Sequence, residues 1–201
     1  MHVVIEPSRY KDQDAVTLRT ELLQAQLIPR VGSSMCSLRW LPSGVELLRQ
    51  GPGERYRLEP YGGSFVAGER AGFDEMLPTI DACFCDQPPW QGIQMPDHGE
   101  LWSIPWEHQV GEREIVFRVW GIRFPYRLEK RLRFVDAGTL RQVPYFAFLP
   151  NEGGADGLSE LFLEPCTSSY DRPDLARLHR ELSILPARGE YVWHLEIAVR
   201  Q

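Results

Sequence analysis

The residues best suited to chemistry lie in one short segment, residues 96–102. The segment places a histidine, His98, between two carboxylates, Asp97 and Glu100, and ends at the indole of Trp102. An imidazole exchanges a proton near neutral pH, and a flat aromatic ring covers the apolar face of a sugar. This mixture predicts a polyol-binding site in which His98 transfers a proton.

An acidic residue far along the chain, Glu164, could form an acid–base pair with His98. Glu164 alternates with Leu161 and Leu163, so in an extended strand it points with Phe162 toward a partly enclosed surface. A carboxylate and an imidazole on opposite sides of a C–O bond could act as base and acid for reversible opening of a sugar ring. The alternative for Glu164 is a strand-end ion pair with an arginine.

Four further residues are candidates for contact with a substrate. Asp74 and Glu75 could accept hydrogen bonds from sugar hydroxyls or cap a turn. Adjacent side chains on a strand point to opposite faces, so at most one reaches a ligand, and Asp74 is favoured. Trp102 is either a stacking platform or part of the core, and Asn151 offers an amide or simply forms a turn.

Composition narrows the classes of partner. The net charge of −6 and the scattered basic residues argue against a nucleic-acid or membrane surface, so a small-molecule ligand is favoured. The four cysteines suit free thiols, and the pair Cys83 and Cys85 lacks a second pair at zinc spacing, so neither a metal nor an organic cofactor is predicted. The first residues lack the pattern of a signal peptide, which makes the cytoplasm the expected location.

Alternating apolar residues predict the elements that position these side chains. Residues 115–119, 128–134 and 192–200 show a period of two, which is typical of half-buried strands. The apolar set of residues 17–28 changes face midway, which indicates a turn or a bulge. The sequence favours one short helix, which starts near Asp171 or Pro173. These patterns, with Gly and Pro between them, predict a single all-β domain over residues 1–201.

Several separate segments occur in the order found in the aldose 1-epimerases, the galactose-mutarotase-like family. The segments that carry this resemblance are residues 27–32, 37–40, 44–48, 72–80, 96–102, 151–154 and 164–167. The sequence therefore resembles this family over nearly its whole length. The resemblance implies an antiparallel β-sandwich of the galactose-mutarotase-like type. It further implies interconversion of the α and β anomers of an aldose, with Glu164 as the base and His98 as a substrate-facing histidine.

The chain departs from the family in the middle. Residues 135–144 replace a longer block that carries several strands and a second histidine before a proline, and no His-Pro pair occurs here. The fold is thus expected to be a truncated sandwich, and the alternative function is a non-catalytic carbohydrate-binding or degenerate mutarotase-like protein. The loss of interior strands would expose sheet edges, which predicts a homodimer or edges covered by the chain's own loops.

Overall fold

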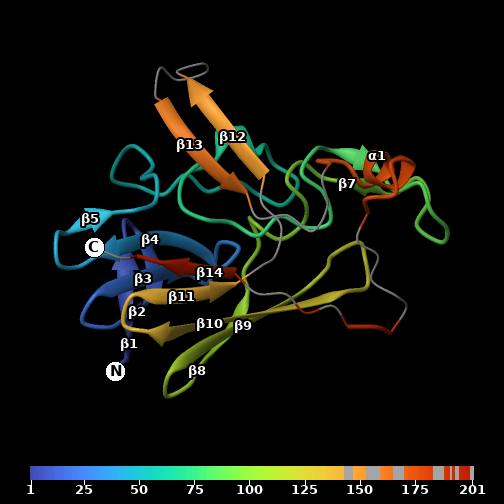
Figure 1. Cartoon of the computed structure of the whole chain (residues 1–201). Helices are drawn as coiled ribbons and strands as arrows, with labels where there is room; N and C mark the ends of the chain where they lie inside the picture. The colour runs from blue at the N-terminus through green and yellow to red at the C-terminus, as the bar shows by residue number, and fades with distance from the viewer. Residues whose placement is uncertain are drawn as a thin grey trace.

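Two five-stranded antiparallel sheets pack as a sandwich around the hydrophobic core (Figure 1). The structure is a computed structural model that describes residues 1–142, 147–152, 159–164, 170–182, 188–190, 192 and 195–199. In the strand residues 141–142, 147–152 and 159–164 it describes the backbone alone. The predicted all-β fold with one short helix is therefore confirmed.

The first sheet is an antiparallel meander in chain order. Its strands are β1 (Val4–Tyr10), β2 (Gln13–Arg19), β3 (Leu23–Ile28), β4 (Ser34–Trp40) and β5 (Val45–Glu46). The second sheet has the order β14-β11-β10-β9-β8. Its strands are β8 (Glu107–Val110), β9 (Glu114–Trp120), β10 (Arg127–Asp136), β11 (Thr139–Gln142) and β14 (Leu195–Ala198).

Smaller elements lie in the connection between β5 and β8 and in the connection between β11 and β14. They are the hairpin β6 (Cys83–Phe84) and β7 (Gln94–Met95), the hairpin β12 (Ala147–Glu152) and β13 (Ser159–Glu164), the 3-10 turn η1 (Phe65–Ala67) and the helix α1 (Pro173–Leu178). Proline occupies the first turn of α1, as predicted, because its missing N–H is unpaired there in any helix. The helix ends before Leu182, which the sequence pattern had placed in it.

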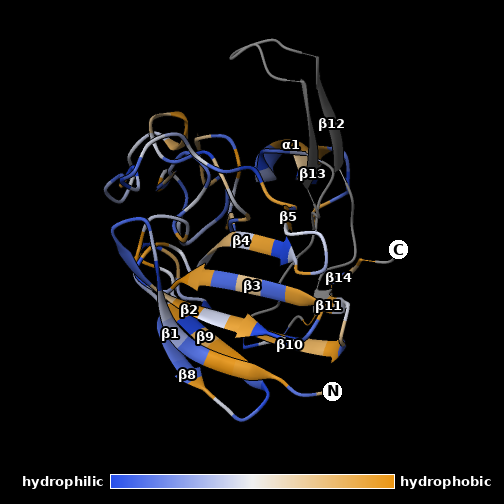
Figure 2. Cartoon of the chain, turned by 90° about the vertical axis from the view of Figure 1, so that its left-hand side faces the viewer, coloured by the Kyte–Doolittle hydropathy of each residue, from blue (hydrophilic) through white to orange (hydrophobic). Residues whose placement is uncertain are grey.

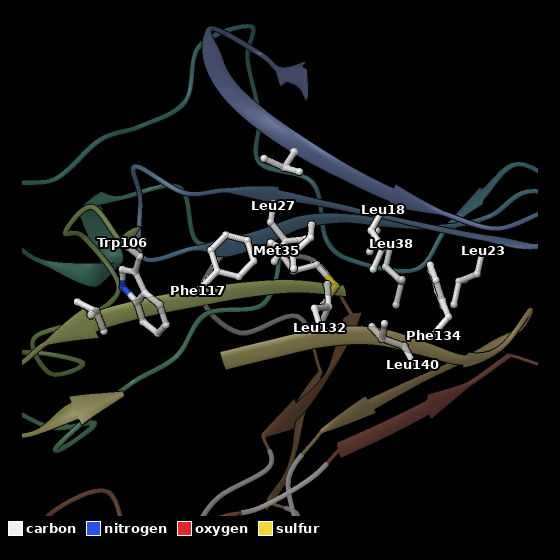
Figure 3. Packing of buried hydrophobic residues seen from close by; sticks show 14 of the residues in the cluster. Leu18, Leu23, Leu27, Met35, Leu38, Trp106, Phe117, Leu132, Phe134 and Leu140 are labelled. Carbon is white, nitrogen blue, oxygen red and sulfur yellow. The ribbon is translucent and has the colours of Figure 1, made fainter. Parts of the chain in front are cut away.

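Alternation along the strands builds the core. Leu27 of β3 lies near Phe117 of β9, and Leu23 of β3 lies near Phe134 of β10 (Figure 3). All four side chains are buried in one cluster. Each large apolar side chain removed from water in this way contributes about 1.5–3 kcal/mol. On β3 the polar residues Gln24 and Gln26 alternate with the buried ones and are only partly buried, and side chains of both sheets form one apolar cluster.

Within residues 17–28, the point at which the apolar residues change face is a turn between β2 and β3. Thr20 stabilises this turn, since its hydroxyl accepts hydrogen bonds from the backbone N–H groups of Leu22 (3.2 Å) and Leu23 (3.1 Å). The same hydroxyl donates to the carbonyl of Ala137 (2.7 Å), which lies between β10 and β11 of the other sheet. One side chain thus joins two turns from opposite sheets.

The last strand, β14, pairs with β11 and not with β13, the strand that precedes it in the sequence. β14 lies antiparallel to β11, with Leu140 opposite Ile197. Leu195 is buried and Glu196 is exposed, which confirms the predicted alternation for these residues. Trp193 and His194 of that pattern lie outside the described residues. Within the described part of the chain, no helix has the length and hydropathy needed to cross a membrane.

Candidate functional site

The segment around His98 is a tight turn held by backbone hydrogen bonds. His98 and Gly99 both have positive φ angles, +57° and +79°. Histidine tolerates this left-handed region better than most residues. The N–H of Glu100 donates to the carbonyl of Leu77 (2.7 Å), and the N–H of Gly99 donates to that of Pro96 (2.9 Å). The turn predicted from the sequence therefore sets the direction of the imidazole.

Asp97 and Phe65 fix the imidazole of His98. Its Nδ1 lies 2.7 Å from Oδ1 of Asp97, while Phe65 stacks on the ring with a centroid distance of 4.0 Å and an interplanar angle of 9°. The other carboxylate oxygen of Asp97 accepts the N–H of Phe65 (2.9 Å). No described residue bonds to Nε2 of His98, so that nitrogen is the one available to a ligand.

Phe65 belongs to a loop that we call the strap, residues 60–68. Besides the bond to Asp97, the Tyr61 hydroxyl of the strap donates to Oε1 of Glu100 (2.9 Å). The strap carries Gly62, Gly63 and Gly68, and its Val66 side chain is exposed. It therefore covers one face of His98 while keeping conformational freedom on both sides of Phe65.

Trp102 lies against the same cluster and Trp106 does not. The Trp102 indole N–H donates to the carbonyl of Asp97 (3.1 Å), and its ring meets Phe65 edge-on at 5.2 Å between centroids. Trp106 is part of the main core, with its N–H bonded to the carbonyl of Leu101 (3.1 Å). Trp102 is also buried, 5% exposed, so most of its surface packs against protein atoms.

A small cleft opens beside this cluster. The side chains that line it are Val31, Tyr56, Arg57, Glu59, Phe65, Glu69, Arg70, Asp74 and Trp102. It combines three aromatic rings with charges of both signs, which suits hydroxyl-bearing ligands. The free space inside it holds only about one water molecule. A sugar ring would therefore need the strap to move.

Asp74 is the ionisable group of this cleft with the most altered acidity. Burial raises the pKa of its carboxyl group to about 7, and the nearby charge of Glu75 adds to the rise. The residue is only partly buried, yet protein atoms surround its carboxyl group. Ser34 and Lys130 act in the opposite direction, although the Ser34 hydroxyl forms no hydrogen bond of ordinary geometry. A carboxyl that titrates near neutrality is suited to proton transfer.

Glu75 points away from this cleft into an ion pair. Its Oε2 lies 2.8 Å from Nζ of Lys130, an almost fully buried lysine on β10. The same ammonium donates to the carbonyl of Ser33 (2.7 Å) and lies 5.5 Å from the centre of the Trp106 ring. Asp74 lines the cleft and Glu75 does not, although the two residues lie outside any strand. Substrate contact by either residue remains a prediction.

Glu100 is a buried carboxylate whose role the sequence did not reveal. Its two oxygens accept hydrogen bonds from the hydroxyls of Tyr61 and Tyr126 (3.1 Å) and from the N–H groups of Ile122 (3.2 Å) and Arg123 (2.8 Å). Four donors replace the water that this fully buried group loses. Glu100 thereby ties the His98 turn to the loop between β9 and β10. The only feature of the sequence that pointed to this role was the position of Glu100 two residues after His98.

The other predicted site residues lie on the β12–β13 hairpin. Glu164 ends β13 opposite Ala147, and Asn151 of β12 pairs with Glu160. Their side chains lie outside the described part of the structure, so the distance between His98 and Glu164 remains open. Trp102 contacts Asp97 and Phe65 beside His98 and also lines the cleft with Asp74, whereas His98 itself does not line that cleft.

The cysteines of the described residues are separate free thiols. Cys36 and Cys83 are buried, and burial raises the pKa of Cys83 while a hydrogen bond from Thr79 opposes the rise. Cys85, two residues on, is partly exposed. Within the ranges given above, no group of three His, Cys, Asp or Glu side chains is placed to hold a metal ion.

Comparison with known proteins assigns no family to this chain. No family model matches the sequence, and no curated protein matches it. Among solved structures, the chain is similar to the 4-alpha-glucanotransferase from Thermococcus litoralis, with a TM-score of 0.39 and 14% identity over 74% of this chain. The chain spans about a quarter (26%) of the length of that enzyme.

Proposed function

We propose that this chain is a carbohydrate-binding protein of the aldose 1-epimerase class that interconverts the α and β anomers of an aldose. The observation that carries the proposal is the oriented imidazole of His98. Asp97 holds Nδ1, and no described residue bonds to Nε2. Phe65, which stacks on the imidazole, also lines the cleft that contains Trp102 and Asp74, a carboxyl group whose pKa burial raises to about 7. The sequence resemblance to the galactose-mutarotase-like family supports the choice of reaction.

The proposed reaction moves two protons and no other group. A carboxylate, Glu164 in this proposal, takes the proton from the anomeric hydroxyl, so that the C1–O1 bond becomes a carbonyl and the C1–O5 bond breaks. Protonated His98 donates its Nε2 proton to the ring oxygen O5. Rotation about the C1–C2 bond and the reverse transfers close the ring as the other anomer. The carboxylate of Asp97 stabilises the imidazolium before transfer.

The alternative is a carbohydrate-binding protein without catalysis. Two observations favour it: the described cleft admits only about one water molecule, and the chain has no His-Pro pair to supply a second histidine. In that case the aromatic residues of the cleft and strap would bind a sugar without a complete proton relay.

Polarimetry of freshly dissolved glucose and galactose separates the two functions. The proposal expects faster anomer exchange than in buffer, and a loss of about 10²- to 10⁴-fold in His98→Ala and Glu164→Gln. His108→Ala, at an exposed histidine on β8, is the matched control and should keep full activity. Sugar binding by calorimetry without faster exchange would support the alternative. Neither binding nor exchange would contradict both.

A further inference from the structure

A second hollow lies on the outer face of the first sheet, away from the core. The side chains that line it are Tyr10, Gln24, Gln26, Ser37, Arg39, Glu46 and Gln50, with the backbone of Gly44, and its volume is about 360 Å³. Figure 2 shows strands β1 to β4 side by side, with polar bands on β3 between apolar ones. We call this hollow the sheet groove.

The strand registers place these polar groups on one surface. Gln24 of β3 lies opposite Arg39 of β4, which in turn lies opposite Glu46 of β5. Gln26 lies opposite Ser37 in the next outward row. The residues between them, including Leu23 and Ala25, point into the core, so the groove is lined by amide, hydroxyl and charged groups.

Side-chain hydrogen bonds hold several of these groups in place. Ser37, only 5% exposed, donates to Oε2 of Glu46 (2.6 Å), and the Tyr10 hydroxyl donates to Oε1 of Gln50 (2.8 Å). The Gln26 amide donates to the hydroxyl of Ser8 (2.9 Å). Bonds between side chains are a minority in folded proteins, and a merely solvated sheet face does not need them. The groove is therefore organised before any ligand arrives.

Other polar groups in the groove retain hydrogen-bonding capacity. The Gln24 side-chain amide has no hydrogen-bond partner among the described residues, and the side-chain Oε1 of Gln26 accepts no bond from them. Arg39 makes only a long contact, 3.4 Å, with the carbonyl of Gly44. Amides and a guanidinium together offer both donors and acceptors, which matches hydroxyl groups that do the same.

Charge and size define the ligand. Arg39 and Glu46 are one cation and one anion side by side, so the groove has no net preference for an anion or a cation. Its volume lies within the range of small-molecule sites. We propose that the sheet groove binds a neutral mono- or disaccharide. This site goes beyond the proposed function, because it needs neither His98 nor Glu164.

Amide NMR during sugar titration tests the proposal. The ¹⁵N-labelled chain is titrated with glucose, galactose, maltose and cellobiose, and the side-chain amides of Gln24 and Gln26 should shift with at least one of them. The variants Gln24→Ala and Arg39→Ala should each weaken that binding by about 3- to 10-fold, the loss expected for one or two hydrogen bonds. Their spectra also report whether they fold.

Two controls separate the groove from the cleft. Gln109→Ala removes an exposed amide from β8 and should leave the affinity unchanged. His98→Ala should abolish anomer exchange, if that function holds, and keep the shifts at Gln24 and Gln26. Shifts confined to the cleft around Trp102, no shifts with any of the four sugars, or full affinity in both groove variants would overturn the proposal.

Discussion

Two acidic residues show how differently the fold supports a buried carboxyl group. Glu100 is fully buried and has four hydrogen-bond donors around its two oxygens. Asp74 has only the Ser34 hydroxyl and the more distant ammonium of Lys130 to favour its charge, and its pKa rises to about 7. The first arrangement stabilises a charge, and the second makes a charge costly above neutral pH.

Asp74→Asn should therefore change stability in a pH-dependent way. Between pH 4 and 7 the folded carboxyl keeps a proton that the unfolded one has lost, so the stability contributed by Asp74 falls as pH rises through this window. The full shift corresponds to about 4 kcal/mol, and because the residue is partly exposed we expect the variant to gain about 1–3 kcal/mol at pH 8. Urea unfolding at pH 4.5 and 8 measures the difference.

The surface variant Asp14→Asn controls for the loss of one charge, since its side chain is 92% exposed. An Asp74→Asn effect of equal size at both pH values would show that Asp74 does not titrate between them.

Glu100→Gln should destabilise the fold. One oxygen becomes an NH₂ group that faces the backbone N–H of Ile122 or Arg123, and an N–H group cannot accept a hydrogen bond. We expect a loss of about 2–3 kcal/mol, which lowers Tm by roughly 4–12 °C. Thermal unfolding measures it, with the exposed Glu107→Gln as control. Equal Tm values in the two variants would contradict this account.

The sequence predicted single residues best where their neighbours in the chain decide their position. The turn at His98 depends on adjacent residues, so it could be predicted. The stacking of Phe65 on His98 could not, because these residues are far apart in sequence and no periodic pattern joins them. Lys130 shows the same limit: it points inward on β10 and is neutralised by a distant carboxylate, Glu75.

At the scale of elements, the strap determines access to His98. Phe65→Ala removes the ring stacked on the imidazole, a contact worth about 0.5–1.5 kcal/mol. The fraction of molecules in which the imidazole is uncovered should therefore rise about 2- to 10-fold. The measurement is the rate at which diethyl pyrocarbonate modifies His98, followed by mass spectrometry. Val66→Ala, at an exposed position in the same 3-10 turn, should leave the rate unchanged. An unaltered rate in Phe65→Ala would mean that the strap does not limit access.

The turn after β3 supports the cleft through a backbone contact. Gly32 has a φ of +59°, and a Cβ there would clash with the backbone carbonyl of Trp102. Gly32→Ala should cost more than about 2 kcal/mol, since it adds a steric clash to the ordinary strain of a left-handed alanine. Gly53→Ala shares the positive φ but has nothing within 4 Å, so it measures the strain alone. Equal losses of unfolding free energy in urea for the two variants would rule out the clash.

Strands were predictable from periodicity because alternation and burial coincide in a sandwich. The strand predicted at residues 115–119 lies within β9, and the one predicted at residues 192–200 contains β14. The length of α1 was not predictable in this way. Leu178 is 76% exposed at its end, so the apolar spacing that suggested a longer helix does not reflect packing.

For the whole molecule, the sheet edges decide whether the proposed homodimer can form. β1 contains Pro7, which has no N–H to donate, and β5 has only two residues. β8 is a four-residue edge strand with every residue exposed, including Val110. Among these edges, β8 is therefore best suited to pair with a second copy.

Light scattering tests this expectation. The chain should have twice its monomer mass at high concentration, and Val110→Lys should restore the monomer because it places a charge on the paired edge. The exposed Val45→Lys on β5 is the control and should remain dimeric. A monomeric mass for the unaltered chain would exclude the homodimer, and a dimer in Val110→Lys would place the interface elsewhere.

The Thr20 hydroxyl has a consequence for the cooperativity of unfolding. It bonds to the turn between β2 and β3 and to the carbonyl of Ala137 between β10 and β11. Neither turn can open to solvent without losing a hydrogen bond to the other sheet. The amide hydrogens of Leu22 and Leu23 should therefore exchange with water only in events that also loosen the second sheet, so the two layers behave as one cooperative unit at this end of the sandwich.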